Sequence, residues 1–169
     1  MGILFSTTPA ALGHLLPLLP LARAARGHGH DVAVLTAQPF SSHLDAGFEM
    51  LPAGPTVDVL LTEVRHRCGT DPSGGTDSEP DPEHVAEFFA GTRVDFTFDQ
   101  ALPAAKVWQP DLIVYEYRDF VGPLIGAVLQ CPATKLAYGE RSRLVYPKFQ
   151  QNRERPARVA KQTFVWLTR

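Results

Sequence analysis

The sequence predicts an open, mostly parallel α/β sheet with helices on both faces. Short apolar runs bounded by turn residues alternate with longer amphipathic stretches along residues 1–138. The 169 residues are 44% hydrophobic and 20% charged, which is typical of a single globular domain that can bury a core. No apolar run reaches the roughly 18–20 residues of a membrane span, and no basic region precedes the first apolar residues. We therefore expect a cytoplasmic protein without a membrane span.

The first strand–helix–strand unit has the clearest pattern. Residues 2–6 are expected to form a buried strand, residues 14–26 a helix with a regular apolar stripe, and residues 31–36 a second strand. Two strands joined by a crossover of roughly 20 residues make the right-handed unit of parallel sheets. Pro20 lies inside the predicted helix and is expected to bend its first turns.

The other elements are expected in the same alternating order, with weaker patterns. Residues 53–83 are expected to be irregular, and residues 69–83 form a loop rich in Gly, Pro, Ser and Asp. The remaining predictions are a short helix over 40–46, a strand over 48–51, a helix over 84–108 with a break near Gly91 and an end near Pro103, a strand over 112–115, a helix over 119–130 and a strand over 132–137.

Charge is divided unevenly along the chain. Residues 140–169 hold eight of the 16 Lys and Arg residues against two acidic ones, whereas residues 1–139 carry a balance of −8. This division predicts a domain over residues 1–138 and a separate basic segment over 139–169, either an interaction arm or a fragment of something larger. The two cysteines, Cys68 and Cys131, lack metal-ligand spacing and indicate a reducing compartment.

Ligands of such sheets bind beyond the carboxyl ends of the strands, so the loops found there are the candidate sites. The first loop, residues 6–14, contains neither GxGxxG nor GK[ST], which excludes the dinucleotide-binding and P-loop classes. It presents His14 at a helix start, where the positive end of the helix dipole disfavours an imidazolium. His14 is therefore a candidate general base, the alternative being a histidine that caps or packs.

Glu116 ends a later strand and is the second candidate. From there a carboxylate could reach His14 and hold its ring in one tautomer, the alternative being a solvated acid or an ion-pair partner of Arg118. His28 and His30 could bind a metal, but their spacing at a turn favours a helix cap. The aromatic helix region that contains Phe88 is expected to be core, with one or two rings lining an acceptor pocket.

Several motifs together resemble a known family. They are Gly13-His14-Leu15-Leu16-Pro17, Arg26-Gly27-His28 with Val32 to Thr36, and Pro110 to Glu116 followed by Gly122-Pro123 and Cys131-Pro132. The pattern is similar to the N-terminal half of GT-B glycosyltransferases of family 1, above all actinobacterial enzymes that glycosylate polyketide and other antibiotic aglycones. The resemblance covers residues 1–138 and implies a Rossmann-like sheet as one half of a GT-B architecture.

The resemblance also implies a mechanism. His14 would take a proton from an acceptor hydroxyl, which attacks the anomeric carbon of a nucleotide sugar with inversion. Glu116 would be its partner, one methylene longer than the family's usual aspartate. No metal and no cofactor is implied. The residues expected to contact the small-molecule acceptor are Thr8, Ala11, Leu12, Gly13, Phe88 and Tyr117.

The family's nucleotide-binding half has no counterpart in these residues. The resemblance thus implies that the nucleotide-sugar donor binds only with a second domain or subunit, and that the chain alone is inactive. The alternative is a non-catalytic binding or scaffold subunit of a split GT-B enzyme. No nucleic-acid partner is expected, because residues 1–139 are acidic and carry no recognition motif.

Overall fold

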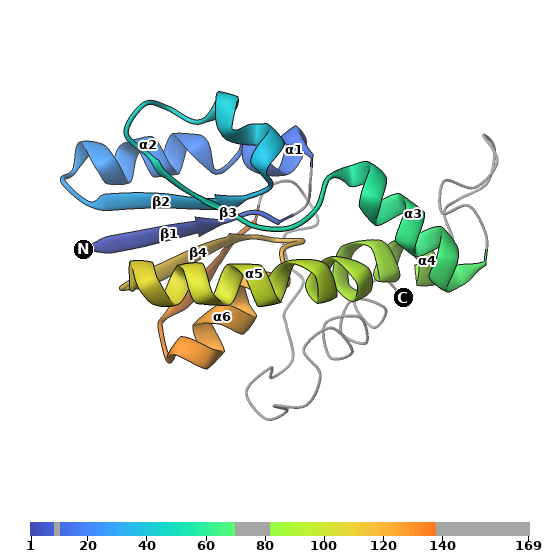
Figure 1. The fold of residues 1–169 in the computed structure, drawn as a ribbon. Coiled ribbons are helices and arrows are strands. Elements are labelled where there is room, and N and C mark those ends of the chain that lie inside the picture. The colour runs from blue at the N-terminus through green and yellow to red at the C-terminus, as the bar shows by residue number, and fades with distance from the viewer. Residues whose placement is uncertain (9–10, 70–81, 138–169) are drawn as a thin grey trace.

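The computed structural model describes residues 1–8, 11–69 and 82–137. They form a five-stranded sheet of order β3-β2-β1-β4-β5 in which all neighbouring strands are parallel (Figure 1). The predicted α/β fold class is confirmed. The strands are β1 (Gly2–Ser6), β2 (Asp31–Thr36), β3 (Glu49–Pro52), β4 (Leu112–Glu116) and β5 (Ala133–Leu136).

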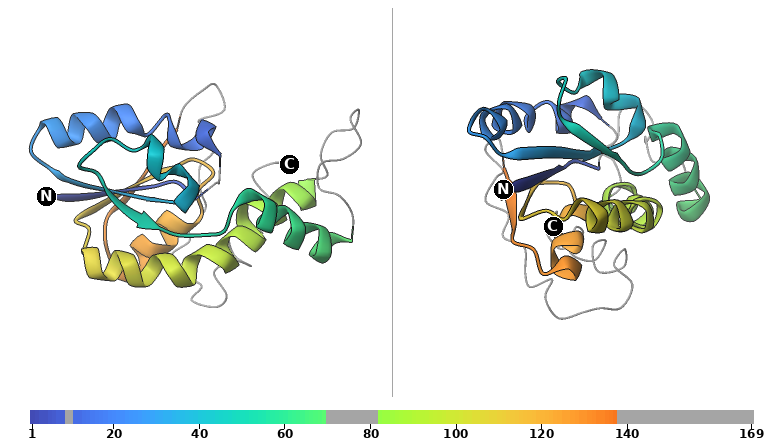
Figure 2. Two further views of the ribbon diagram at one scale, coloured as in Figure 1. Left: turned by 45° about the horizontal axis from the view of Figure 1, so that its top comes forward. Right: turned by 60° about the vertical axis from the view of Figure 1, so that its left-hand side comes forward.

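Helices cover both faces of the sheet, α1 and α2 on one face and α5 and α6 on the other (Figures 1 and 2). A parallel sheet needs this double cover because its crossover connections leave apolar side chains on both faces. The helices are α1 (Leu12–Leu15), α2 (Leu19–Gly27), the 3₁₀ helix η1 (Gln38–His43), α3 (Val57–Cys68), α4 (Pro82–Ala86), the π-helix η2 (Glu87–Gly91), α5 (Thr92–Trp108) and α6 (Val121–Leu129).

The core has two clusters separated by the sheet. In β1, Ile3 and Phe5 pack toward α1 and α2, whereas Leu4 between them packs toward α5 and α6. This alternation follows from the two-residue repeat of a strand. The buried stripe of the first crossover consists of Leu15, Leu18, Leu19 and Ala22, as the helical spacing predicts.

The predicted helix over 14–26 is divided into α1 and α2. Prolines at 17 and 20 supply no N–H, so hydrogen bonds of the helical ladder are missing between the two pieces. Pro20 instead lies in the first turn of α2, where a missing N–H costs little. The expected bend is therefore a break, and it leaves α1 as a single turn.

The segment that follows β3 is more regular than predicted. Residues 53–83 were expected to be irregular, but α3 occupies Val57–Cys68 and ends at Gly69 in the left-handed conformation. Only Leu60 and Val64 of α3 are buried, while Val57 and Val59 are exposed. With two buried residues in twelve, the apolar periodicity of this helix is too weak to be recognised in the sequence.

Residues 82–108 form one continuous long helix made of α4, η2 and α5, which we call the long helix. The predicted break near Gly91 corresponds to the π-helical turn η2, but the predicted end near Pro103 is wrong. The helix continues to Trp108 because Ala101 and Ala105, on either side of the proline, are fully buried against the sheet. Packing on both sides offsets the hydrogen bond that the proline removes.

The other boundaries differ from the predicted ones by one or two residues, except that the helix expected over 40–46 is the 3₁₀ helix η1. Residues 70–81 of the predicted loop and the predicted basic segment 139–169 lie outside the described residues. Within the described part of the chain, no helix is both long and apolar enough to cross a membrane.

Candidate functional site

His14 and Glu116 meet at the carboxyl edge of the sheet. His14 Nδ1 lies 3.0 Å from Glu116 Oε1; the His14 side chain is 14% exposed and that of Glu116 is fully buried. The two atoms are within hydrogen-bonding distance, although the angle at the nitrogen departs from that of a well-aligned hydrogen bond. The expected contact between the two side chains is therefore present at this distance, and their catalytic role stays a prediction.

Strand pairing explains why these two residues meet. β1 and β4 are neighbours, and Ser6 at the end of β1 pairs with Tyr115 in β4. Glu116 is the next residue of β4, while the loop after β1 leads into α1 with His14. Oε2 of Glu116 accepts a hydrogen bond of 2.9 Å from the main-chain N–H of Arg118, which fixes the carboxylate.

The helix that was expected to disfavour an imidazolium at His14 through its dipole is only one turn long. α1 has four residues and no acidic residue in its first turn, so His14 is at once in its first and last turn. A dipole summed over one turn is small. The environment of the ring is therefore set by its neighbours and not by a long helix.

Aromatic side chains surround the His14 ring. The Phe89 ring meets it edge to face at 5.9 Å between centroids, and the Tyr117 ring lies at 6.3 Å. The Arg118 guanidinium lies over both of these rings, 5.0 Å from the Phe89 centroid and 5.2 Å from that of Tyr117. Apolar walls with a few polar groups are typical of small-molecule sites.

The residues predicted to contact an acceptor are placed differently from one another. Ala11 and Gly13 are exposed, Leu12 is partly buried against the core, and Tyr117 lies beside His14. Thr8 is 2% exposed, and its hydroxyl donates to Asp119. Their role as acceptor contacts stays a prediction.

Phe89, the residue after the predicted Phe88, is the one whose ring meets His14. Phe88 packs edge to face on Phe89 at 5.0 Å, and the Arg93 guanidinium lies 4.9 Å from the Phe88 centroid. The sequence places both phenylalanines in one aromatic region but gives no means of choosing between them. The choice depends on the π-helical turn, because both phenylalanines lie in η2, where one extra residue changes the direction of their side chains relative to α5.

Asp119, which was not among the candidate residues of the sequence, is fully buried and accepts several hydrogen bonds. Its Oδ1 accepts from the Thr8 hydroxyl at 2.8 Å and from the N–H groups of Val121 and Gly122 that open α6, and its Oδ2 accepts from Ser6. Burial raises the pKa of the Asp119 carboxyl, and these hydrogen bonds oppose that rise. An aspartate just before an apolar helix is a capping signal that could have indicated it.

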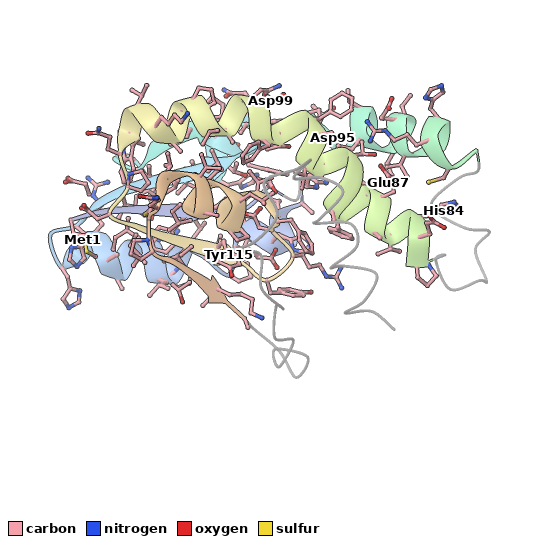
Figure 3. All side chains as sticks on the ribbon, turned by 90° about the horizontal axis from the view of Figure 1, so that it is seen from below. Met1, His84, Glu87, Asp95, Asp99 and Tyr115 are labelled. Atoms are coloured by element: carbon pink, nitrogen blue, oxygen red, sulfur yellow. The ribbon has the colours of Figure 1, made fainter. Side chains whose placement is uncertain are left out.

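A second cluster of charges ties α3 to the long helix. Arg67 on α3 contacts Glu63 at 2.7 Å, Glu87 at 3.1 Å and Asp95 at 2.7 Å. Figure 3 shows Glu87 and Asp95 along the long helix, on the side where α3 lies. These hydrogen bonds hold the pKa of Arg67 above its usual value despite partial burial. Arg67 is thus occupied with intramolecular contacts.

Nothing in residues 1–8, 11–69 and 82–137 groups three His, Cys, Asp or Glu side chains as a metal ion would require. His28, one candidate ligand, has its Nδ1 2.8 Å from the carbonyl of Ala24 at the end of α2. This contact agrees with the helix-cap interpretation.

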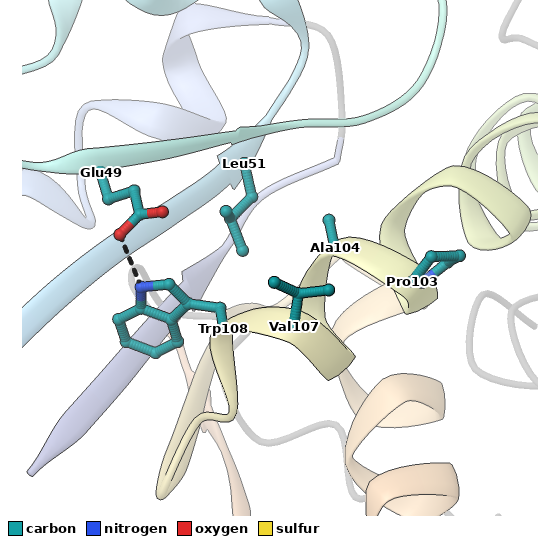
Figure 4. A pocket seen from close by; sticks show the side chains of 6 residues that line it. All are labelled: Glu49, Leu51, Pro103, Ala104, Val107 and Trp108. Atoms are coloured by element: carbon teal, nitrogen blue, oxygen red, sulfur yellow. Dashed lines mark hydrogen bonds between the residues drawn. The ribbon is translucent and has the colours of Figure 1, made fainter.

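An open groove lies at the opposite end of the sheet. It is lined by the start of β3 and the last turns of α5, and Trp108 Nε1 donates to Glu49 at 2.9 Å across it (Figure 4). Because strands begin here, this groove is at the amino edge, away from His14. Its lining residues are Glu49, Leu51, Pro103, Ala104, Val107 and Trp108.

The amino-acid sequence matches a known family over most of its length. Residues 23–168 match the model described as "Erythromycin biosynthesis protein CIII-like, N-terminal domain". The chain belongs to this family. Relatives of this erythromycin CIII-like N-terminal domain include the 3-alpha-mycarosylerythronolide B desosaminyl transferase of Saccharopolyspora erythraea, 29% identical over 82% of this chain and 37% of that protein. The L-demethylnoviosyl transferase of Streptomyces niveus is 30% identical over 82% of this chain and 35% of that protein.

Solved structures agree with this family. The glycosyltransferase SsfS6 of Streptomyces sp. SF2575 matches with a TM-score of 0.67 and 26% identity over 99% of this chain and 44% of that chain. The glycosyltransferase SnogD of Streptomyces nogalater matches with a TM-score of 0.66 and 27% identity over 97% and 39%. The chain thus spans 35–44% of the length of these four proteins.

Proposed function

We propose that this chain is the acceptor-binding part of an inverting glycosyltransferase that acts on a hydroxyl of a hydrophobic natural product. The observation that carries the proposal is the His14–Glu116 contact of 3.0 Å at the carboxyl edge of the sheet, beside the Phe89 and Tyr117 rings. The names of the relatives support it, since they transfer sugars to compounds such as mycarosylerythronolide B and tylactone.

In this proposal, Glu116 sets the tautomer of His14. With its proton on Nδ1 facing the carboxylate, the imidazole keeps a lone pair on Nε2. Nε2 takes the proton of the acceptor hydroxyl while its oxygen forms a bond to the anomeric carbon. The bond from that carbon to the phosphate oxygen breaks on the opposite face, so the configuration inverts and a nucleoside diphosphate leaves. Glu116 stabilises the imidazolium that results.

Acceptor binding is tested by titrating the chain with hydrophobic aglycones, macrolactones and aromatic polyketides, and following heat or tryptophan fluorescence. We expect saturable binding that His14→Ala largely retains, because a general base acts on the transition state more than on ground-state affinity. Phe89→Ala should weaken binding, because it removes a ring that lies beside His14. No binding of any aglycone to the wild-type chain would contradict the proposal.

Transfer is the second part of the test. We expect the 169-residue chain to transfer no sugar by itself, because transfer needs a nucleotide sugar held in line and a displacement of about 1 Å can cost roughly 100-fold. With a nucleotide-binding half supplied as a second chain, His14→Ala should lower the rate by about 100- to 10,000-fold. Equal rates for wild type and His14→Ala would instead favour a non-catalytic binding or scaffold role.

A further inference from the structure

Arg93 is a buried cation that the proposed mechanism does not use. It lies in the first turn of α5, and it is 1% exposed. Burial lowers the pKa of its guanidinium to about 10, against the attraction of Asp119, so the group stays protonated at neutral pH. Burying a charge is costly unless the charge is fully paired.

Within the part of the chain that the structure describes, Arg93 is only partly paired. Its Nη1 donates to the main-chain carbonyl of Thr8, and its guanidinium faces the Phe88 ring. Its Nε and Nη2 have no hydrogen-bond partner among the described residues. Buried polar groups normally have all their hydrogen-bond partners, so a buried guanidinium with unpaired donors is not explained by stability alone.

The hydrogen bond from Arg93 falls on Thr8, which lies between β1 and α1 with His14. Thr8 follows β1, and its hydroxyl is held at 2.8 Å by Asp119 while its carbonyl is held by Arg93. The N–H of Asp119 in turn donates to the carbonyl of Glu116 at 2.9 Å. Thr8 is therefore held from two sides, and one of the two holding groups is hydrogen-bonded to the residue that contacts His14.

We propose that Arg93 is a positioning residue that holds Thr8 after β1, and through it and the Phe88–Phe89 pair orders the His14 ring against Glu116. This inference rests on the proposed function of His14 as a base. Arg93 acts through Thr8 and through Phe88, which packs on Phe89, the ring that meets His14. The order of the His14 ring is therefore expected to depend on the guanidinium of Arg93.

The test compares Arg93→Met with Arg93→Lys in the full chain. The two replacements have similar length, but only lysine keeps a charge and a donor for the Thr8 carbonyl. For Arg93→Met we expect a chain that still folds, shifted and broadened ring signals of His14 by NMR, and exchange of the Thr7 and His14 amides faster by about tenfold or more. Arg93→Lys should restore most of the His14 spectrum.

The first control is the ring of His30 at the other edge of the sheet, whose signals should stay unchanged in Arg93→Met. The second is the variant Arg23→Met on the exposed side of α2, which should leave the His14 signals unchanged. His14 signals and amide exchange that stay at wild-type values in Arg93→Met would overturn the proposal. So would an Arg93→Met chain that unfolds, because Arg93 would then serve the fold itself, or an Arg93→Lys spectrum identical to that of Arg93→Met.

These readouts need no acceptor, so they separate the two proposals. If the wild-type chain binds no aglycone, the proposed function fails, while the His14 spectrum still decides whether Arg93 orders the ring. If aglycones bind, Arg93→Met should weaken their binding through Phe88 and Phe89, and not through His14, and Arg93→Lys should recover it.

Discussion

Some buried hydroxyl groups of this domain have a hydrogen-bond partner and others have none among the described residues. Thr92 and Thr97 show the contrast on one helix, since both are fully buried in α5. The Thr92 hydroxyl donates to Glu87 at 2.9 Å, whereas the Thr97 hydroxyl has no partner among the described residues. A hydroxyl without a partner costs desolvation and returns little.

This contrast predicts opposite effects of the same substitution. Thr97→Val should leave the free energy of unfolding unchanged or raise it by up to about 1 kcal/mol, because an unpaired hydroxyl is replaced by a methyl group. Thr92→Val should lower it by about 1–3 kcal/mol, because the buried Glu87 loses a donor. Urea denaturation of the two variants measures both values. A larger loss in Thr97→Val than in Thr92→Val would contradict the assignment.

At this scale the sequence predicts the pair of His14 and Glu116 but not its surroundings. The two residues could be inferred because His14 lies on the connection after β1 and Glu116 ends β4, and parallel strands bring such positions to one edge. Phe89 and Arg93 could not be inferred, since the direction of Phe89 relative to Arg93 depends on the π-helical turn η2 that contains Phe89. A buried arginine also has no signature in an amphipathic pattern, which assigns charged residues to the surface.

Close approach between elements is the next scale, and α6 provides the sharpest case. A Cβ atom at Gly122 would lie 2.8 Å from the Cβ of Tyr115 and 3.0 Å from that of Ser6. Both atoms are attached directly to strand backbone and cannot turn away. The start of α6 therefore sits on β1 and β4 with no room for a side chain, beside the capping contacts of Asp119.

We expect Gly122→Ala to lower the free energy of unfolding by about 1–3 kcal/mol, since overpacking forces backbone to shift. Gly27→Ala is the matched control, because a Cβ atom there meets nothing within 4 Å and the residue ends α2. Alanine should stabilise that position or leave it unchanged. Thermal unfolding of both variants decides the matter, and equal midpoints would refute the close contact inferred at α6.

Elements were predictable where their burial was regular. The strands and α6 were located within one or two residues because both faces of the sheet are covered and the apolar runs are continuous. α3 was missed because only Leu60 and Val64 face the core. The end of the long helix was misplaced at Pro103 because local propensity gave way to the packing of Ala101 and Ala105.

The whole described molecule is one doubly covered sheet, with its two core clusters contained in residues 3–125 and its last strand ending at Leu136. A chain of residues 1–138 would keep all five strands and both helical layers. We expect it to unfold cooperatively, with a midpoint close to that of the 169-residue chain, in thermal circular dichroism. A broad transition without a pretransition baseline would show that residues 139–169 belong to the same folding unit.

The π-helical turn η2 sets the direction of the aromatic pair on the long helix. Phe88 and Phe89 lie in η2, and Ala86 and Ala90 beside them are buried in the same core cluster as Val94 of α5. Each residue of an α-helix turns the chain by roughly 100°. Removing the extra residue of η2 would therefore turn the Phe89 ring away from His14 relative to the part of the helix that follows. The ring beside the histidine thus depends on the length of a single helical turn.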